Sequence, residues 1–161
     1  MGDDNAVPRP LANLMTEAKE GRLRVRMEPE EFVYLDRDCE FFKDQIQQIQ
    51  LIMDKISRQD RWGLGEDYQT KDGKRLVSGE TMVSRFRKKA RSSDNNDNSV
   101  YAVMESHYNI VEDIQNMFRA IREQFSQADS AWAARYTDLE ANLPQQQPAP
   151  QRMFSFPFPR A

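Results

Sequence analysis

Apolar residues recur at alternating steps of three and four over residues 32–56, and this stripe limits the fold more than any other feature. The spacing keeps its members on one face of an α-helix, and over about four heptads it is typical of helices that pack lengthwise. Each side chain contributes roughly 1.5–3 kcal/mol when buried and nothing when left in water. We therefore expect a pairing seam made of Phe32, Leu35, Phe42, Ile46, Ile49, Met53 and Ile56, with Cys39, the only cysteine, as a small hydrophobe within it.

This first helix has clear start and stop signals. Pro29 suits the first helical position, and two glutamates follow it in the turn where the helix dipole favours negative charge. The run Trp62-Gly63-Leu64-Gly65 then supplies two helix-breaking glycines behind an aromatic residue. The pattern predicts a helix over about 29–60, followed by a turn motif formed by Trp62, Gly63 and Gly65.

A second apolar stripe follows an Asn/Asp-rich loop and predicts a helix over about 99–142. It would be roughly 20 Å longer than the first helix, so a simple hairpin would leave apolar length uncovered. The expected fold is all-α, an elongated antiparallel helical hairpin or small coiled-coil bundle with disordered termini. Its expected parts are an N-terminal arm (1–28) with a short helix at 11–20, a hairpin domain (29–143) with a further helix at 79–91, and a Pro/Gln/Phe tail (144–161).

Composition supports this fold and argues against an enzyme. Charged residues make up 30% of the chain, the hydrophobic set only 39%, and glycine occurs six times, which suits a helical chain with one buried face. No phosphate loop, nucleophile–base pair or set of metal ligands is recognisable. His107, the only histidine, falls on the second stripe, where we expect a buried or boundary residue. We expect no catalytic residues, metal, cofactor or small-molecule substrate.

Positive charge gathers in residues 71–91, which carry eight cations against two carboxylates in a chain of net charge −3. Such a segment could contact phosphate, an anionic membrane or an acidic partner surface. With only Phe86 interleaved, we favour the simpler interpretation that it balances the acidic first helix, and nucleic acid is not expected. The expected basic patch comprises Arg85, Arg87, Lys88, Lys89 and Arg91.

Tyr136 and Glu140 lie one helical turn apart near the end of the second stripe. With this pair and the Trp62-Gly63 break, the chain resembles the helical-hairpin substrates of type VII (ESX) secretion in actinobacteria and their relatives, the Trp-x-Gly and Esp-like families. The resemblance implies a hairpin that pairs into a four-helix bundle. It also implies that Tyr136 and Glu140 form an export signal, Tyr-x-x-x-Asp/Glu, read by a secretion ATPase. The chain departs from the family pattern in having Leu64 where the strict motif has Gly, and in the inserted stretch 66–98.

The expected function is therefore that of a non-enzymatic, type VII secretion-associated protein that pairs with a helical partner or with itself, as a homo- or heterodimer. It would be cytoplasmic before export and then secreted or held at the cell surface, since the N-terminus lacks the cationic start and apolar run of a Sec signal peptide. Two alternatives stay open. One is a cytosolic coiled-coil adaptor or regulator with no secretion role, and the other is a binder of anionic surfaces or nucleic acid through residues 71–91.

Overall fold

A computed structural model describes residues 9–23, 25–74, 76–92 and 98–146, and the described part of the chain is all-α, as predicted. Residues 147–161, most of the predicted disordered tail, lie outside the described residues. No helix in the described residues is long and apolar enough to cross a membrane. The helices are α1 (Ala12–Lys19), α2 (Pro29–Ser57), α3 (Val77–Ala90), α4 (Val100–Ala128) and α5 (Ser130–Ala141).

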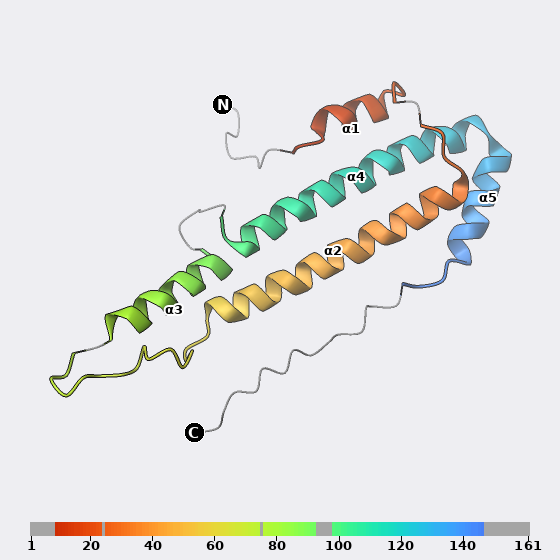
Figure 1. The fold of residues 1–161 in the computed structure, drawn as a ribbon. Helices are drawn as coiled ribbons and strands as arrows, with labels where there is room; N and C mark the ends of the chain where they lie inside the picture. Colours follow the sequence, from red (N-terminus) through yellow and green to blue (C-terminus); the bar gives the residue numbers. More distant parts are fainter. Residues whose placement is uncertain (1–8, 24, 75, 93–97, 147–161) are drawn as a thin grey trace.

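Two long antiparallel helices, α2 and α4, lie side by side and form the body of the molecule (Figure 1). The short helix α1 packs on α4, while α5 turns across one end of the hairpin and contacts both long helices. At the opposite end, α3 and the loop before it extend the molecule beyond the tips of α2 and α4. The predicted elongated antiparallel hairpin is confirmed.

The signals read from the sequence do start α2. Pro29 occupies the first turn, and the backbone N–H of Glu28 donates to the Glu31 carboxylate at 2.7 Å. This carboxylate satisfies one of the donors that a helix start leaves free. The helix ends at Ser57, three residues before the predicted end at 60.

The single helix expected over 99–142 is instead two helices, and this correction changes the architecture. Asp129 interrupts the chain with extended backbone angles, and its carboxylate accepts from the backbone N–H of Ala131 at 2.9 Å and of Trp132 at 3.1 Å. An aspartate that caps a new helix competes well with continuing the old one. Because α5 folds back, α2 and α4 have 29 residues each, and the expected excess length does not exist.

The apolar core sits at the α5 end of the hairpin. Phe32 lies at its centre, with its ring 5.6 Å from Trp132 and 6.1 Å from Phe118 between ring centroids. Trp132 in turn stacks on Tyr136 at 5.8 Å. The buried members of this core are Ala18, Phe32, Val33, Ile121 and Tyr136. Four of the five helices therefore meet at one end of the molecule.

Farther along the hairpin, polar groups fill part of the contact between α2 and α4. The Gln115 side chain is fully buried, and its Nε2 donates to the Asp36 backbone carbonyl at 3.2 Å and to the Glu40 carboxylate at 2.8 Å. Arg119 pairs with the carboxylates of Asp36 and Glu40. Since polar residues occupy this contact, part of the predicted apolar seam faces elsewhere.

Candidate interaction surfaces

The Trp-Gly motif forms a compact loop closed on Glu66, a residue that sequence reasoning missed. The Glu66 carboxylate accepts from the backbone N–H groups of Trp62, Gly63 (3.0 Å) and Leu64 (2.8 Å). Gly63 and Gly65 have φ of +71° and +84°, the left-handed region that glycine adopts without strain. The N–H of Trp62 is the largest cause, and these donors together lower the pKa of Glu66 to about 2. An acid placed directly after Gly-x-Gly was the available signal, because such loops turn successive N–H groups toward an anion.

This loop serves as a bracket for α3. A Cβ atom on Gly79 would lie 2.7 Å from the Leu64 carbonyl oxygen, so only glycine permits this approach of helix and loop. Trp62 stacks on Phe86 of α3 at 5.7 Å, and its Nε1 donates to the Gln59 carbonyl at 3.0 Å. The motif therefore joins α2 to α3 and is not a tight turn between the two long helices.

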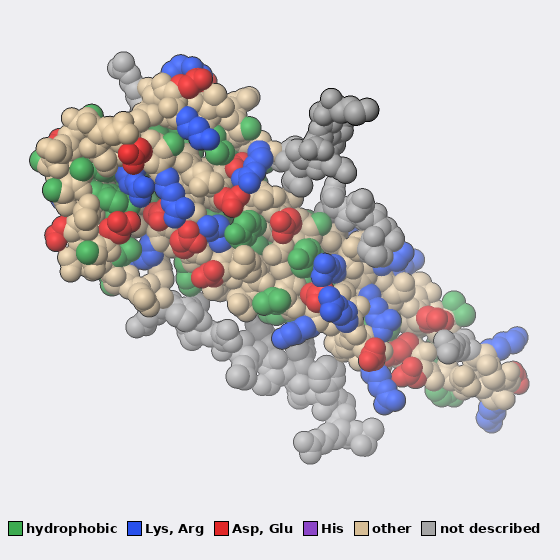
Figure 2. All heavy atoms as spheres, turned by 180° about the vertical axis from the view of Figure 1, so that it is seen from behind, with side chains coloured by type: hydrophobic (Ala, Val, Ile, Leu, Met, Phe, Trp, Pro, Cys, Tyr) green, Lys and Arg blue, Asp and Glu red, His purple; other side chains and the backbone are tan. Residues whose placement is uncertain are grey.

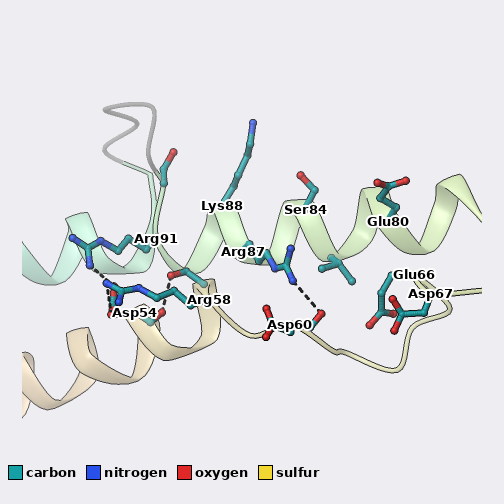
Figure 3. Close-up of a pocket in the computed structure, with 13 residues that line it drawn as sticks. Asp54, Arg58, Asp60, Glu66, Asp67, Glu80, Ser84, Arg87, Lys88 and Arg91 are labelled. Atoms are coloured by element: carbon teal, nitrogen blue, oxygen red, sulfur yellow. Dashed lines mark hydrogen bonds and ion pairs between the residues drawn. The ribbon is translucent and has the colours of Figure 1, made fainter.

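Between the bracket, α2 and α3 lies a groove of about 680 Å³ (Figure 3). Arg87 donates to the backbone carbonyls of Gln59 and Asp60, while Arg91 and Arg58 both pair with Asp54. Figure 3 shows Lys88 directed away from the cluster around Asp54. The charged side chains lining the groove are Asp54, Asp60, Glu66, Asp67, Glu80, Arg58, Arg87, Lys88 and Arg91.

The groove thus holds five carboxylates and four cations, which nearly cancel. Figure 2 shows the same interleaving of red and blue groups over the narrow end of the molecule. Of the predicted basic patch, Arg87 donates to backbone carbonyls, Arg91 pairs with Asp54, and Lys89 donates to the Asn98 carbonyl at 3.4 Å. Arg85, Lys88, Lys89 and Arg91 are exposed. This geometry favours charge balance within the chain over a continuous anion-binding surface.

The structure splits the predicted seam between two environments. Phe32 and Ile46 are buried, together with Cys39, and Leu35, Met53 and Ile56 are half-buried. Phe42 is 57% exposed and Ile49 is 37% exposed, so these two do not pack on α4 as a continuous seam would require. Other large apolar side chains are exposed on the neighbouring helices: Met82 and Phe86 of α3, and Val100 and Val103 of α4. We use the name open face for the exposed apolar residues of the two stripes, which are Phe42 and Ile49 of α2 and Val100 and Val103 of α4.

Tyr136 and Glu140 lie together at the opposite end, with unequal access to water. The Tyr136 side chain is buried in the core, and burial is the main cause that raises its pKa. Its hydroxyl accepts from Arg122 at 2.9 Å and donates to the exposed Glu140 carboxylate at 3.3 Å. A protein reading this end of the folded chain would meet the carboxylate and not the ring.

Two further expectations concern chemistry. His107 is exposed on α4, so the expectation of a buried or boundary histidine is wrong; its stripe is uncovered at that end of the hairpin. Among the described residues, no group of three or more His, Cys, Asp or Glu side chains is placed to hold a metal ion.

Comparison with protein-family models, with curated proteins and with solved structures finds no match to this chain.

Proposed function

We propose that this protein is a non-enzymatic helical protein associated with type VII secretion. It binds a helical partner chain, or a second copy of itself, along the open face. The observation that carries the proposal is the exposure of large apolar side chains on both long helices. A two-helix hairpin cannot bury both flanks of its apolar stripes by itself.

Short helices cover only one end of the hairpin, which supports a partner chain on the remaining part. α1 and α5 cover the core end, where Phe32 and Ile121 are buried. In the described residues no helix covers Phe42 or Val103 in the same way. Exposed large apolar side chains favour contact with another protein, because their burial contributes about 25 cal/mol per Å². Helices of matching length are the simplest element to lie along α2 and α4.

The pairing part is tested by substituting an exposed seam residue. Ile49→Gln removes apolar surface from the open face and should leave the fold intact because the side chain is partly in water already. We expect weaker co-purification of the partner from the native host, at unchanged thermal stability. Leu51→Gln is the matched control, since Leu51 is also exposed but lies on another face of α2. Equal recovery of the partner with both variants would contradict the proposal that Ile49 lies in the pairing surface.

The export part rests on Tyr136 and Glu140, which are hydrogen-bonded at the end of the last helix. In this proposal the Glu140 carboxylate is the group that a secretion ATPase contacts, and the buried Tyr136 ring positions it. The protein would be cytoplasmic first and then secreted or surface-bound.

Glu140→Gln tests the export signal better than removal of the tyrosine ring, because Tyr136→Ala would also damage the core. We expect less protein in the culture medium and a normal cytoplasmic level of folded protein. Glu123→Gln, another exposed helical carboxylate, is the control. Undiminished export of the Glu140 variant would remove the secretion part of the proposal and return the protein to the cytosolic adaptor alternative.

An anionic-surface function remains a separate alternative, favoured only by the exposed Arg85 and Lys89 beside the half-exposed Phe86. Arg85→Glu with Lys89→Glu should then abolish binding to anionic vesicles, and binding should weaken steeply with added salt. Vesicle binding that is unaffected by the two substitutions and by added salt would exclude this alternative.

A further inference from the structure

Exposed apolar side chains lie along one face of α2. Ile52 is 51% exposed and follows Phe42 and Ile49 at helical spacing. Steps of seven and three keep the three residues on one face, and Asp38 lies on the same face one turn before Phe42. We call Phe42, Ile49 and Ile52 the flank line.

The chain returns to the start of this line after α5. Arg37 Nη1 donates to the Pro144 carbonyl at 3.3 Å, and Gln146 Nε2 donates to the Asp38 carboxylate at 2.7 Å. Figure 1 shows the blue segment after α5 leading back beside α2. The described chain therefore ends next to the flank line, held there by two side-chain hydrogen bonds.

The sequence that follows is suited to cover apolar surface. Residues 153–158 read Met-Phe-Ser-Phe-Pro-Phe, with three phenylalanines at alternate positions. Proline fixes part of the backbone in advance, so such a segment loses less conformational freedom when it binds. The intervening spacer is polar and rich in glutamine and proline.

The lengths match. From Gln146 to Phe154 the chain can span about 25 Å in an extended conformation. Along α2, the distance from Asp38 to Ile52 is about 21 Å. Tethering through so short a spacer also gives an effective local concentration in the millimolar range.

We infer that residues 153–158 dock in cis on the flank line, with the phenylalanine rings against Phe42, Ile49 and Ile52. The tail then covers this part of α2 while no partner is bound. Because Phe42 and Ile49 also belong to the open face, a partner chain must displace the tail. The docking itself does not depend on the proposed function, since it involves one chain only.

Methyl NMR of the purified full-length protein tests the contact. Docked rings shift the δ1-methyl resonances of Ile49 and Ile52. We expect the full chain carrying Phe154→Ser, Phe156→Ser and Phe158→Ser to lose these shifts, while the methyl resonance of the core residue Ile121 stays in place. The matched control, Gln147→Ser with Gln151→Ser in the spacer, should leave all three resonances unmoved.

Two outcomes would overturn the inference. If the Ile49 and Ile52 resonances are the same with and without the phenylalanines, the tail does not dock. If the shifts are present but vanish on dilution, the contact is between molecules, and a second copy occupies the line. Shifts that persist on dilution and disappear with the phenylalanines support docking in cis.

Discussion

At the residue scale, the helical spacing of Tyr136 and Glu140 does not determine which of the two side chains is buried. Helical spacing placed Tyr136 and Glu140 on the same side of their helix, and their hydrogen bond agrees with that placement. Spacing cannot tell which way that side points, because the direction depends on how α5 docks. The ring joins the core beside Trp132, and only Glu140 stays in water.

Tyr136→Phe should therefore have a small effect and Tyr136→Ala a large one. The phenylalanine keeps the stacked ring and loses only the bonds to Arg122 and Glu140, a cost of about 0.5–1.5 kcal/mol. The alanine leaves a cavity in the core, which costs roughly 3–5 kcal/mol. Urea unfolding of the two variants measures the difference. Equal losses of stability would show that the ring is not packed as described.

Glu66 gives a prediction for pH. Its pKa is about 2 in the folded loop against the ordinary value of 4.5, so the folded loop is stabilised by the ionised form. This contribution is complete above the ordinary pKa and is lost as the pH falls from about 4.5 through 2. In a Trp132→Phe background, Trp62 fluorescence should report a loop transition in this window, and Glu66→Gln should remove it. A transition unchanged by Glu66→Gln would assign the pH dependence to other carboxylates.

Gly79 is the residue on which the docking of α3 depends most. In Gly79→Ala the new methyl group would collide with the Leu64 carbonyl, and we expect a loss of roughly 1–3 kcal/mol from overpacking. The Trp62–Phe86 stack should separate, which Trp62 fluorescence in the Trp132→Phe background detects. Thr81→Ala, at an exposed position of the same helix, should leave the fluorescence unchanged. A Gly79 variant with native fluorescence would contradict the bracket.

At the scale of elements, most helices follow from the sequence. α1, α2 and α3 differ from the predicted bounds by at most three residues, because caps, prolines and glycines act locally. The break at Asp129 was missed since the apolar steps continue through it with only a small change of phase. Periodicity shows which residues share a face, and it does not show whether the helix axis continues in one direction.

The α4–α5 break is predicted to depend on the Asp129 cap. Asp129→Ala removes both capping bonds, which costs about 0.5–2 kcal/mol, and alanine favours one continuous helix. We expect a lower melting temperature and weaker near-UV circular dichroism from Trp132 as α5 leaves the core. Ser130→Ala, next in the chain and exposed, is the control. Identical melting of the two variants would show that packing alone sets the break.

The seam illustrates the same limit for helix pairing. Spacing identifies the members of the seam, but it does not show which of them face α4. Gln115 and Arg119 bind Asp36 and Glu40, so this polar cluster occupies part of the contact between α2 and α4. The apolar stripe is consequently turned partly away from α4, and the Phe42 side chain is exposed.

At the scale of the whole molecule, the hairpin has three regions that differ in the side chains they contain. The α5 end holds the aromatic core and the Tyr136–Glu140 pair, the middle is joined by polar groups, and the α3 end carries the bracket and the charge-balanced groove (Figures 1 and 2). The open face lies between these ends. The buried aromatic core is thus confined to one end, and large apolar side chains of both long helices are exposed outside it.

Site-specific photocrosslinking in the native host can detect the proposed contact between the open face and another helical chain. A photoreactive phenylalanine analogue is placed at Phe42 on α2, at Val103 on α4, and at Leu51 as the control outside the open face. We expect one adduct of the same mass from Phe42 and Val103, containing a helical partner or a second copy, and none from Leu51. Adducts absent from both open-face positions, or equally strong at Leu51, would contradict it.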